Sequence, residues 1–377
     1  MKYRPELDGL RAIAVVSVML VHGDLIGRGA DLRGAGTSLP HLLRGGVFGV
    51  DIFFVLSGFL ITTLLLQEHE RTGRIDFLAF YMRRALRLLP AMGLLLLACT
   101  ALVLSGHAGD RFDLTAVGLA AAYISNFVVI VAGDRLGILT QTWSLSIEEQ
   151  FYSLWPITLL FLLRLTSRKT IIAAILGGAA VAVLLRLIFF LVWSGQTDDK
   201  TLMIGTYTLP TRADGLLLGA AVAAAYCWGL LPKGRAASLL TVVSAAWVCW
   251  MLVFVNSIPN PNLYYGTYAL VGVATAGLIA GLTTAPPGWV KSAMSWPPLV
   301  WTGKISYGLY LYHVPVFALL AWPLERPVVA FVVAFGLTFA AAALSYYGVE
   351  RRFLAMKHRI RLRVDRSLAS TKPTVSV

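Results

Sequence analysis

The sequence has few charged residues and very few cysteines. Only 14% of its 377 residues are charged, whereas about a quarter are charged in a typical soluble chain. Hydrophobic residues make up 58%, which excludes an ordinary soluble domain and indicates a membrane protein with many apolar segments. The three cysteines, Cys99, Cys227 and Cys249, all lie in apolar stretches, where cysteine behaves as a small hydrophobic residue. Their spacing predicts neither a disulfide framework nor a zinc site.

Acidic residues are scarcer than basic ones, 19 against 32, so the net charge is +13. Eight of the basic residues follow Glu350, next to the last apolar stretch. Such a tail is typical of a cytoplasmic anchor near anionic lipid. We therefore expect membrane lipids, and no nucleic acid, as partners. The chain divides into a transmembrane domain, 1–349, and a basic cytoplasmic tail, 350–377.

About eleven stretches are apolar and long enough to be considered as membrane spans. Basic residues near both ends of the chain place both termini in the cytoplasm, so the number of crossings is even. Three stretches lie between Arg87 and Arg164 where only two crossings fit, so part of 114–150 is expected to be re-entrant or incomplete. We predict an all-α, polytopic helical bundle in the cell (inner or plasma) membrane, with about 10 transmembrane helices plus one re-entrant or partial helix. The stretches are 9–27, 46–66, 87–105, 114–132, 144–163, 170–193, 210–231, 238–255, 263–283, 304–322 and 328–349.

The motifs of soluble enzymes are also missing. We find no Walker loop, no dinucleotide fingerprint after a strand, no histidine pair at metal-ligand spacing and no nucleophile elbow. We therefore expect no metal and no tightly bound cofactor.

Arg11 and His22 are the most informative pair in the first apolar stretch. Eleven residues bring a helix back to nearly the same face about 16 Å further along its axis. Asp8 lies on the same stripe. Ionisable groups inside a bilayer are costly and usually mark function, and histidine is suited to act as a general base near neutral pH. The alternative is an imidazole that only hydrogen-bonds to a neighbouring helix.

Asp51 and Ser57 lie in the second stretch, within GGVFGVDIFFVLSGFLIT. An aspartate between apolar residues needs a cationic partner, and Arg11 is one candidate. Structural pairing and catalysis both remain open for Asp51. Small residues here let a helix or a substrate approach closely; these are Gly45, Gly46, Gly49 and Gly58.

Arg84 and Arg87 are three residues apart, so they lie on one helical face, with Arg83 beside them. Paired guanidiniums form good forks for phosphate groups. A cluster that only obeys the positive-inside rule is the alternative.

Two further groups of polar residues lie in apolar stretches. Glu148 and Glu149 open one stretch, where they either line a cavity or complement the start of a helix. His313 either packs in the bundle or lines the same cavity as His22.

Three more charges fall near the ends of predicted spans. Arg212 and Asp214 form either an intramembrane pair or a salt bridge at the outer rim. Arg186 is expected to extend outward to the interface.

At these residues the sequence resembles the acyltransferase 3 family of membrane O-acyltransferases. The Arg-x10-His pattern of the family falls on Arg11 and His22, and its Arg-x2-Arg pattern on Arg84 and Arg87. Its WSL-x2-Glu segment falls on residues 143–148. The matching segments, in order, are LDGLRAIAVVSVMLVH, GVDIFFVLSGFLIT, RRALR, TWSLSIEEQFYSLWP and ISYGLYLYHVPV.

The resemblance implies transfer of an acyl group, usually acetyl, from cytosolic acyl-CoA to a hydroxyl of a cell-surface carbohydrate or glycolipid. Acyl-CoA, first of all acetyl-CoA, is then the donor substrate. His22 is expected to be the catalytic base, with Arg11 on the thioester oxygen or a phosphate. The expected orienting groups are Glu148 and Glu149; the acyl-CoA site is Arg83, Arg84 and Arg87; and the cavity lining is Asp8, Asp51, Ser57 and His313.

Some members of the family carry an extracytoplasmic hydrolase-like domain. Fewer than 30 residues follow the last predicted span of this chain, which leaves room for a separate extracytoplasmic partner enzyme. The alternative function is a transporter, such as a flippase or exporter of a glycolipid or polysaccharide, because buried charges and broken spans suit it too. A transporter of this kind consumes no acyl-CoA.

Overall fold

The computed structural model describes residues 3–23, 43–108, 112–165, 167–193, 199–256, 262–320 and 327–356. Within these ranges the chain is helical and contains no strand, which confirms the all-α prediction. Most of the predicted tail, 357–377, lies outside the described residues. The elements are α1 (Pro5–Val21), η1 (Gly46–Phe48), α3 (Gly49–Thr72), α4 (Phe77–Leu104), α5 (Leu114–Ala121), α6 (Ser125–Ala132), η3 (Gly133–Leu139), α7 (Thr142–Leu165), α8 (Arg168–Trp193), α9 (Asp199–Tyr207), α10 (Leu209–Cys227), α11 (Gly234–Phe254), η4 (Leu263–Thr267), α12 (Tyr268–Thr284), α13 (Trp289–Met294), α14 (Pro297–Lys304), α15 (Ser306–Leu320), α16 (Pro327–Ser345) and η5 (Tyr346–Glu350).

Six helical segments in the described part of the chain are long and apolar enough to cross a membrane. The protein is therefore a membrane protein, while the predicted number of about 10 crossings stays a prediction. Several other helices are short or carry charges, such as α15 with 15 residues and α10 with Arg212 and Asp214. The six segments are Gly46–Thr72, Phe77–Leu104, Arg168–Val192, Gly234–Phe254, Leu263–Thr284 and Val328–Met356.

The stretch 114–132 is not a continuous helix. It forms α5 and α6, of eight residues each, separated by a turn in which Tyr123 has a positive φ of 54°. Eight helical residues span only about 12 Å, too short for the hydrocarbon core. The structure confirms the prediction that a segment in this region is incomplete.

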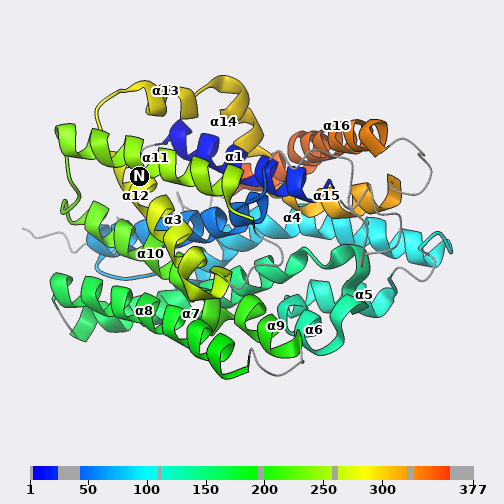
Figure 1. Cartoon of the computed structure of the whole chain (residues 1–377), viewed down its shortest axis with the longest axis horizontal. Coiled ribbons are helices and arrows are strands. Elements are labelled where there is room, and N and C mark those ends of the chain that lie inside the picture. Colours follow the sequence, from blue (N-terminus) through cyan, green and yellow to red (C-terminus); the bar gives the residue numbers. More distant parts are fainter. Residues whose placement is uncertain are drawn as a thin grey trace, which may run out of the picture.

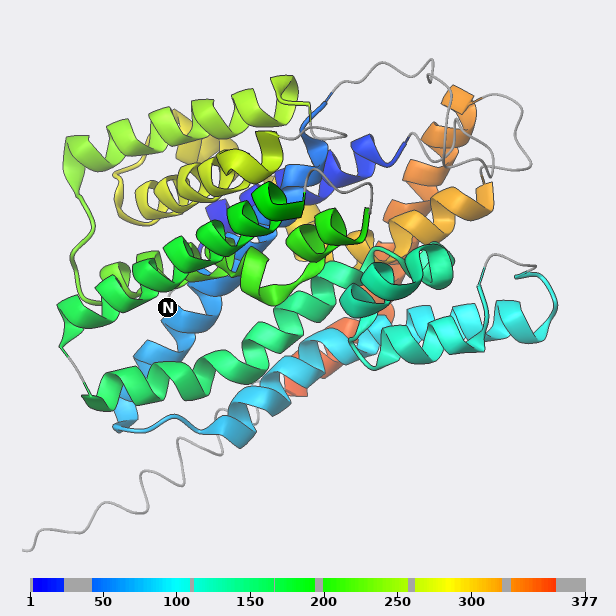
Figure 2. The ribbon, with the colours of Figure 1, turned by 60° about the horizontal axis from the view of Figure 1, so that its bottom comes forward.

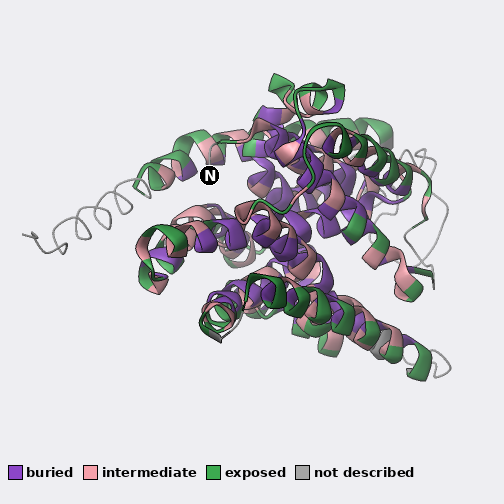
Figure 3. Cartoon of the chain, turned by 90° about the vertical axis from the view of Figure 1, so that its left-hand side faces the viewer, coloured by how far each residue is buried: buried purple, intermediate pink, exposed green. Residues whose placement is uncertain are grey.

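Helix α3 is the centre of the bundle (Figures 1 and 2). It packs most extensively against α10 and also contacts α1, α12 and α7. In its apolar window 78% of residues are buried, against 28% for α4, α8 and α16. Figure 3 shows the same division, with buried residues inside the bundle and exposed residues on the outward faces of the peripheral helices. The polar residues of α3 must therefore face other helices or a cavity.

The turn from α3 to α4 sets the relation between these two helices. Helix α3 ends at Gly73, which adopts the left-handed conformation with φ 70°, as glycine commonly does after a helix. Helix α4 begins after Asp76, whose carboxylate accepts a hydrogen bond of 2.9 Å from the backbone N–H of Ala79. The short connection places the arginines of α4 beside the last turns of α3.

Two glycines permit the contact between α3 and α10. A Cβ on Gly58 would collide with the carbonyl oxygen of Leu216, and one on Gly219 with the carbonyl oxygen of Val55. The predicted role of small residues in close approach is confirmed, because a Cβ on each of the other predicted glycines would also collide with the backbone of a neighbouring helix; these are Gly45, Gly46 and Gly49.

Replacing Gly219 with alanine should therefore force α3 and α10 apart. We expect a loss of about 1–3 kcal/mol, the usual cost of overpacking a tight contact, measured as a lower unfolding temperature in detergent. The matched control is Gly93→Ala in α4, where the added Cβ meets no atom within 4 Å. An equal drop for both variants would contradict the account of this contact.

Candidate active site

A cavity of about 510 Å³ follows one face of α3. Its lining residues recur every three or four positions from Val50 to Arg71, as expected for one side of a helix. The 21 steps between them correspond to about 30 Å of helix length, comparable to the thickness of a hydrocarbon core. The α3 residues are Val50, Phe53, Leu56, Ser57, Leu60, Ile61, Leu64, Gln67, Glu68 and Arg71.

The two ends of the cavity differ in chemistry. At the end near the α3–α4 turn, the lining includes Glu68, Arg71 and Arg83. At the other end it is formed by Phe53, Tyr310 and their neighbours, with Arg11 of α1 as the charged group there. The first end suits an anionic group and the second an apolar one.

The three predicted arginines of α4 all line the cavity, but their surroundings differ. Arg83 donates to Glu68 Oε2 at 2.9 Å. Arg84 lies 3.5 Å from the centroid of the Tyr152 ring. Arg87 forms no ion pair within 4 Å with any of the described residues, so its guanidinium is the one best placed to receive an anion.

Glu148 and Glu149 lie on either side of Arg84. The nearest oxygens of the two carboxylates are 3.7 and 3.6 Å from guanidinium nitrogens. Glu148 lines the cavity and accepts hydrogen bonds from Ser57 Oγ at 3.1 Å and from the Tyr152 hydroxyl at 2.8 Å. Glu149 is not among the lining residues. Arg84 is therefore held by protein groups and in turn fixes the Glu148 carboxylate.

His22 and His313 are brought together, with ring centroids 5.1 Å apart in an edge-to-face arrangement. Nδ1 of His22 lies 2.8 Å from the carbonyl oxygen of Val18, and Nδ1 of His313 lies 2.7 Å from that of Tyr310. A carbonyl oxygen only accepts, so Nδ1 carries the hydrogen in both neutral rings and Nε2 bears the lone pair. Each Nε2 is thus the basic atom of its ring.

Neither histidine is among the residues that line the cavity. Tyr310 connects the two regions, because it lines the cavity while its ring centroid lies 5.5 Å from that of His313. Sequence reasoning missed Tyr310 and Ser144, whose hydroxyls are 2.6 Å apart. The signal for Tyr310 was its spacing of three from His313, which places both on one helical face.

On α1, Arg11 lines the cavity while its partner Asp8 does not. The two side chains form an ion pair of 3.1 Å, and the Tyr3 hydroxyl donates to Asp8 at 2.8 Å. Although 63% of Tyr3 is exposed, partial burial together with this hydrogen bond raises its pKa to about 12. Tyr3 therefore stays protonated near neutral pH and keeps Asp8 in place behind Arg11.

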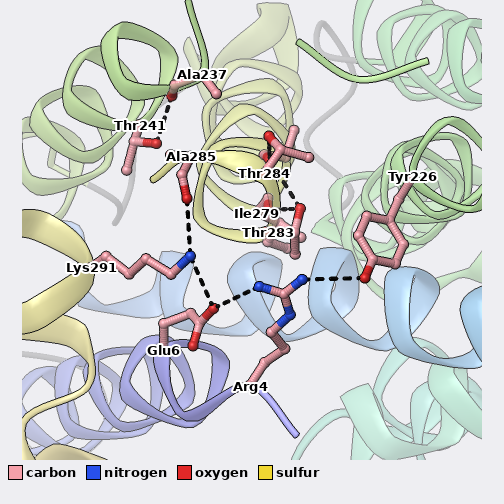
Figure 4. Close-up of polar contacts among 11 residues, drawn as sticks. Arg4, Glu6, Tyr226, Ala237, Thr241, Ile279, Thr283, Thr284, Ala285 and Lys291 are labelled. Carbon is pink, nitrogen blue, oxygen red and sulfur yellow. Dashed lines mark hydrogen bonds and ion pairs between the residues drawn. The ribbon is translucent and has the colours of Figure 1, made fainter. Parts of the chain in front are cut away.

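The start of α1 is anchored by a second group of charges (Figure 4). Glu6 is buried and lies 3.4 Å from Arg4 and 3.8 Å from Lys291 of α13. Arg4 also donates to the Tyr226 hydroxyl at 3.3 Å, and Lys291 to the carbonyl oxygen of Ala285 at 3.1 Å. These contacts fix α1 against α10 and α13, and with it the positions of Arg11 and His22.

The expectation that Arg11 pairs with Asp51 is wrong. Asp51 instead accepts a hydrogen bond of 2.7 Å from Arg212 of α10, because its side chain faces α10 and is not part of the cavity lining. Arg212 is stacked on the Tyr268 ring, 3.9 Å from its centroid. The Asp51 carboxylate thus has a structural partner.

The expectations for Arg186 and Asp214 are also corrected. Arg186 does not reach outward: its side chain is 0% exposed and makes two hydrogen bonds to the Asp214 carboxylate, of 3.0 and 2.8 Å. Asp214 therefore pairs with Arg186 and not with Arg212. The carboxylate and the carbonyl oxygen of Thr211 accept hydrogen bonds from the two terminal nitrogens of the guanidinium inside the bundle, while its Nε has no hydrogen-bond partner among the described residues.

Residues 4–347 match the family model described as an acyltransferase domain, so the chain belongs to the acyltransferase 3 family. It is 32% identical over 368 residues to the peptidoglycan O-acetyltransferase OatA of Listeria monocytogenes, with coverage of 93% of this chain and 55% of that protein. It is 31% identical over 366 residues to the O-acetyltransferase OatA of Staphylococcus aureus, with coverage of 93% and 57%. The chain thus spans little more than half the length of these relatives. No solved structure matches it.

Asp214→Asn should destabilise the protein strongly. The substitution leaves the Arg186 charge buried without a counter-ion, which typically costs about 3–5 kcal/mol. Thermal unfolding in detergent measures the effect. The control, Asp113→Asn, removes a carboxylate from an exposed ion pair with Arg135 and should cause no measurable change. Wild-type stability of the Asp214 variant would show that the buried pair is not needed.

Proposed function

We propose that this protein transfers an acetyl group from cytosolic acetyl-CoA to a hydroxyl of a carbohydrate polymer of the cell envelope. The observation that carries the proposal is the cavity along α3, which leads from a cluster of arginines to Tyr310, whose ring lies next to that of His313 in the histidine pair. The names of the relatives support acetyl as the group and peptidoglycan as the polymer. We further propose that the protein lies in the cell membrane with both termini in the cytoplasm.

In this proposal the phosphates of CoA bind at the arginine end of the cavity. Arg83 and Arg87 line that part of it, and guanidinium forks suit phosphate oxygens. Arg84 is engaged by Glu148 and Glu149 and acts by holding those carboxylates. The uncharged arm of CoA then extends along α3 between apolar side chains, and the thioester comes to rest at the inner end.

His22 acts as the base. Its Nε2 takes the proton from the acceptor hydroxyl, and the hydroxyl oxygen attacks the thioester carbon, so that a C–O bond forms. Arg11 stabilises the charge that develops on the thioester oxygen. The C–S bond then breaks, and the proton on His22 passes to the CoA thiolate.

A transporter also contains buried charges and broken helices. The relatives named as O-acetyltransferases favour group transfer over transport. Release of free CoA that depends on a carbohydrate acceptor separates the two functions, since a transporter releases none.

His22→Ala should abolish acetyl transfer in membranes while the amount of protein stays unchanged. A general base contributes about 10²- to 10⁴-fold to a rate, and we expect a loss of that size. Mass spectrometry of the acceptor gives the readout. The exposed His107 provides the control, and His107→Ala should retain full activity. Substantial acetyl transfer by the His22 variant would show that His22 is not the catalytic base.

Arg87→Lys should weaken acetyl-CoA binding, because a point charge cannot reproduce the guanidinium fork. We expect the Kd to rise about tenfold, equivalent to about 1.4 kcal/mol, in a titration of the detergent-solubilised protein. Arg135→Lys, at an exposed ion pair remote from the cavity lining, serves as the control. An unchanged Kd for the Arg87 variant would show that Arg87 does not bind acetyl-CoA and serves only to set the orientation of the helix in the membrane.

A further inference from the structure

Side chains from four helices line the inner end of the cavity, near the start of α3. They are Val50 and Phe53 on α3, Arg11 on α1, Ser144 on α7 and Tyr310 on α15. On α15 the lining recurs at Ser306, Tyr307 and Tyr310 and then stops, although the next turn of the same face carries His313. The cavity therefore ends one helical turn before the histidine pair.

Tyr310 is fixed firmly at this end. Its hydroxyl lies 3.1 Å from the carbonyl oxygen of Gln141 and 2.6 Å from Ser144 Oγ, and Ser144 Oγ lies 3.5 Å from the same carbonyl oxygen. Only 6% of the residue is exposed. Both hydroxyl hydrogens are used inside the protein, so neither is available to the thioester. A molecule in the cavity therefore contacts the ring of Tyr310 and not its hydroxyl.

Phe53 completes the closure from the opposite helix. Its ring centroid lies 6.2 Å from that of Tyr310, with the two planes inclined at 66°, an edge-to-face geometry favourable for aromatic pairs. Closely packed rings of this kind yield little space. A chain pushed along the cavity toward the histidines meets this aromatic pair first.

We propose that Phe53 and Tyr310 determine the length of the acyl group that the protein accepts. The ring pair leaves room for the two carbons of acetyl and excludes longer acyl chains, because each added methylene must displace a packed ring. This inference rests on the proposed use of acyl-CoA, and it assigns the two residues a role in specificity and none in proton transfer.

The test is a competition between acetyl-CoA and butyryl-CoA for the purified full-length chain in lipid nanodiscs with a peptidoglycan acceptor. Mass spectrometry gives the ratio of butyryl to acetyl groups transferred. Wild type should strongly favour acetyl. Phe53→Ala and Tyr310→Leu should each raise the ratio about tenfold, the lower end of what one methylene is worth in a pocket. Tyr310→Phe keeps the ring and should keep the wild-type ratio.

Phe59→Ala is the matched control. Phe59 is on the same helix and fully buried, but it packs against Tyr226 and does not line the cavity. Truncating it should lower stability and leave the acyl ratio unchanged. Because the ratio is measured within one sample, it does not depend on how much protein is folded.

The outcomes separate the two proposals. Acetyl transfer by wild type, with the wild-type acyl ratio in both Phe53→Ala and Tyr310→Leu, would overturn the inference while the proposed function stands. An equal change in Phe59→Ala would also overturn it, since the effect would then not be specific to the ring pair of Phe53 and Tyr310. A wild-type protein that consumes no acyl-CoA at all would refute the proposed function itself.

Discussion

The ion pair between Arg212 of α10 and Asp51 of α3 joins two helices inside an apolar bundle. Neither charge can be left alone there, because an unpaired buried charge is very costly. Together with the close approach at Gly58 and Gly219, the pair fixes how α3 sits against α10. Asp51 and Gly58 lie on nearly the opposite face of α3 from the cavity stripe, by the helical period. Anchoring one face of α3 thus leaves the other to line the cavity.

Charge is distributed unevenly along that free face, and the distribution gives the cavity a direction. On α3 the charged lining residues, Glu68 and Arg71, lie near the α3–α4 turn, whereas aromatic rings and Arg11 of α1 lie at the other end. Arg84 is enclosed by Tyr152 and two carboxylates, whereas Arg87 keeps its guanidinium for a ligand. A molecule that is anionic at one end and apolar at the other, as an acyl-CoA is, matches this order of side chains.

Much of the site was predictable because it depends on helical spacing alone. Arg11 and His22 share a face of one helix, and Arg84 and Arg87 are one turn apart. That part of 114–150 is incomplete followed from counting basic residues, while the position of the break within 114–132 did not. The sequence did not predict which residue each buried charge pairs with. Asp51 pairs across 161 positions with Arg212, and Arg186 pairs with Asp214, because packing decides which of several buried cations lies nearest. The closing role of Tyr310 escaped notice because its neighbour Ser144 comes from a different helix.

A structure of the protein with a non-hydrolysable acetyl-CoA analogue tests the central claim most directly. The account predicts density along the full face of α3, with phosphates against Arg83 and Arg87 and the acetyl end against the rings of Phe53 and Tyr310. An analogue bound on another face of the bundle, or in the reverse direction with its acetyl group at the arginines, would contradict it.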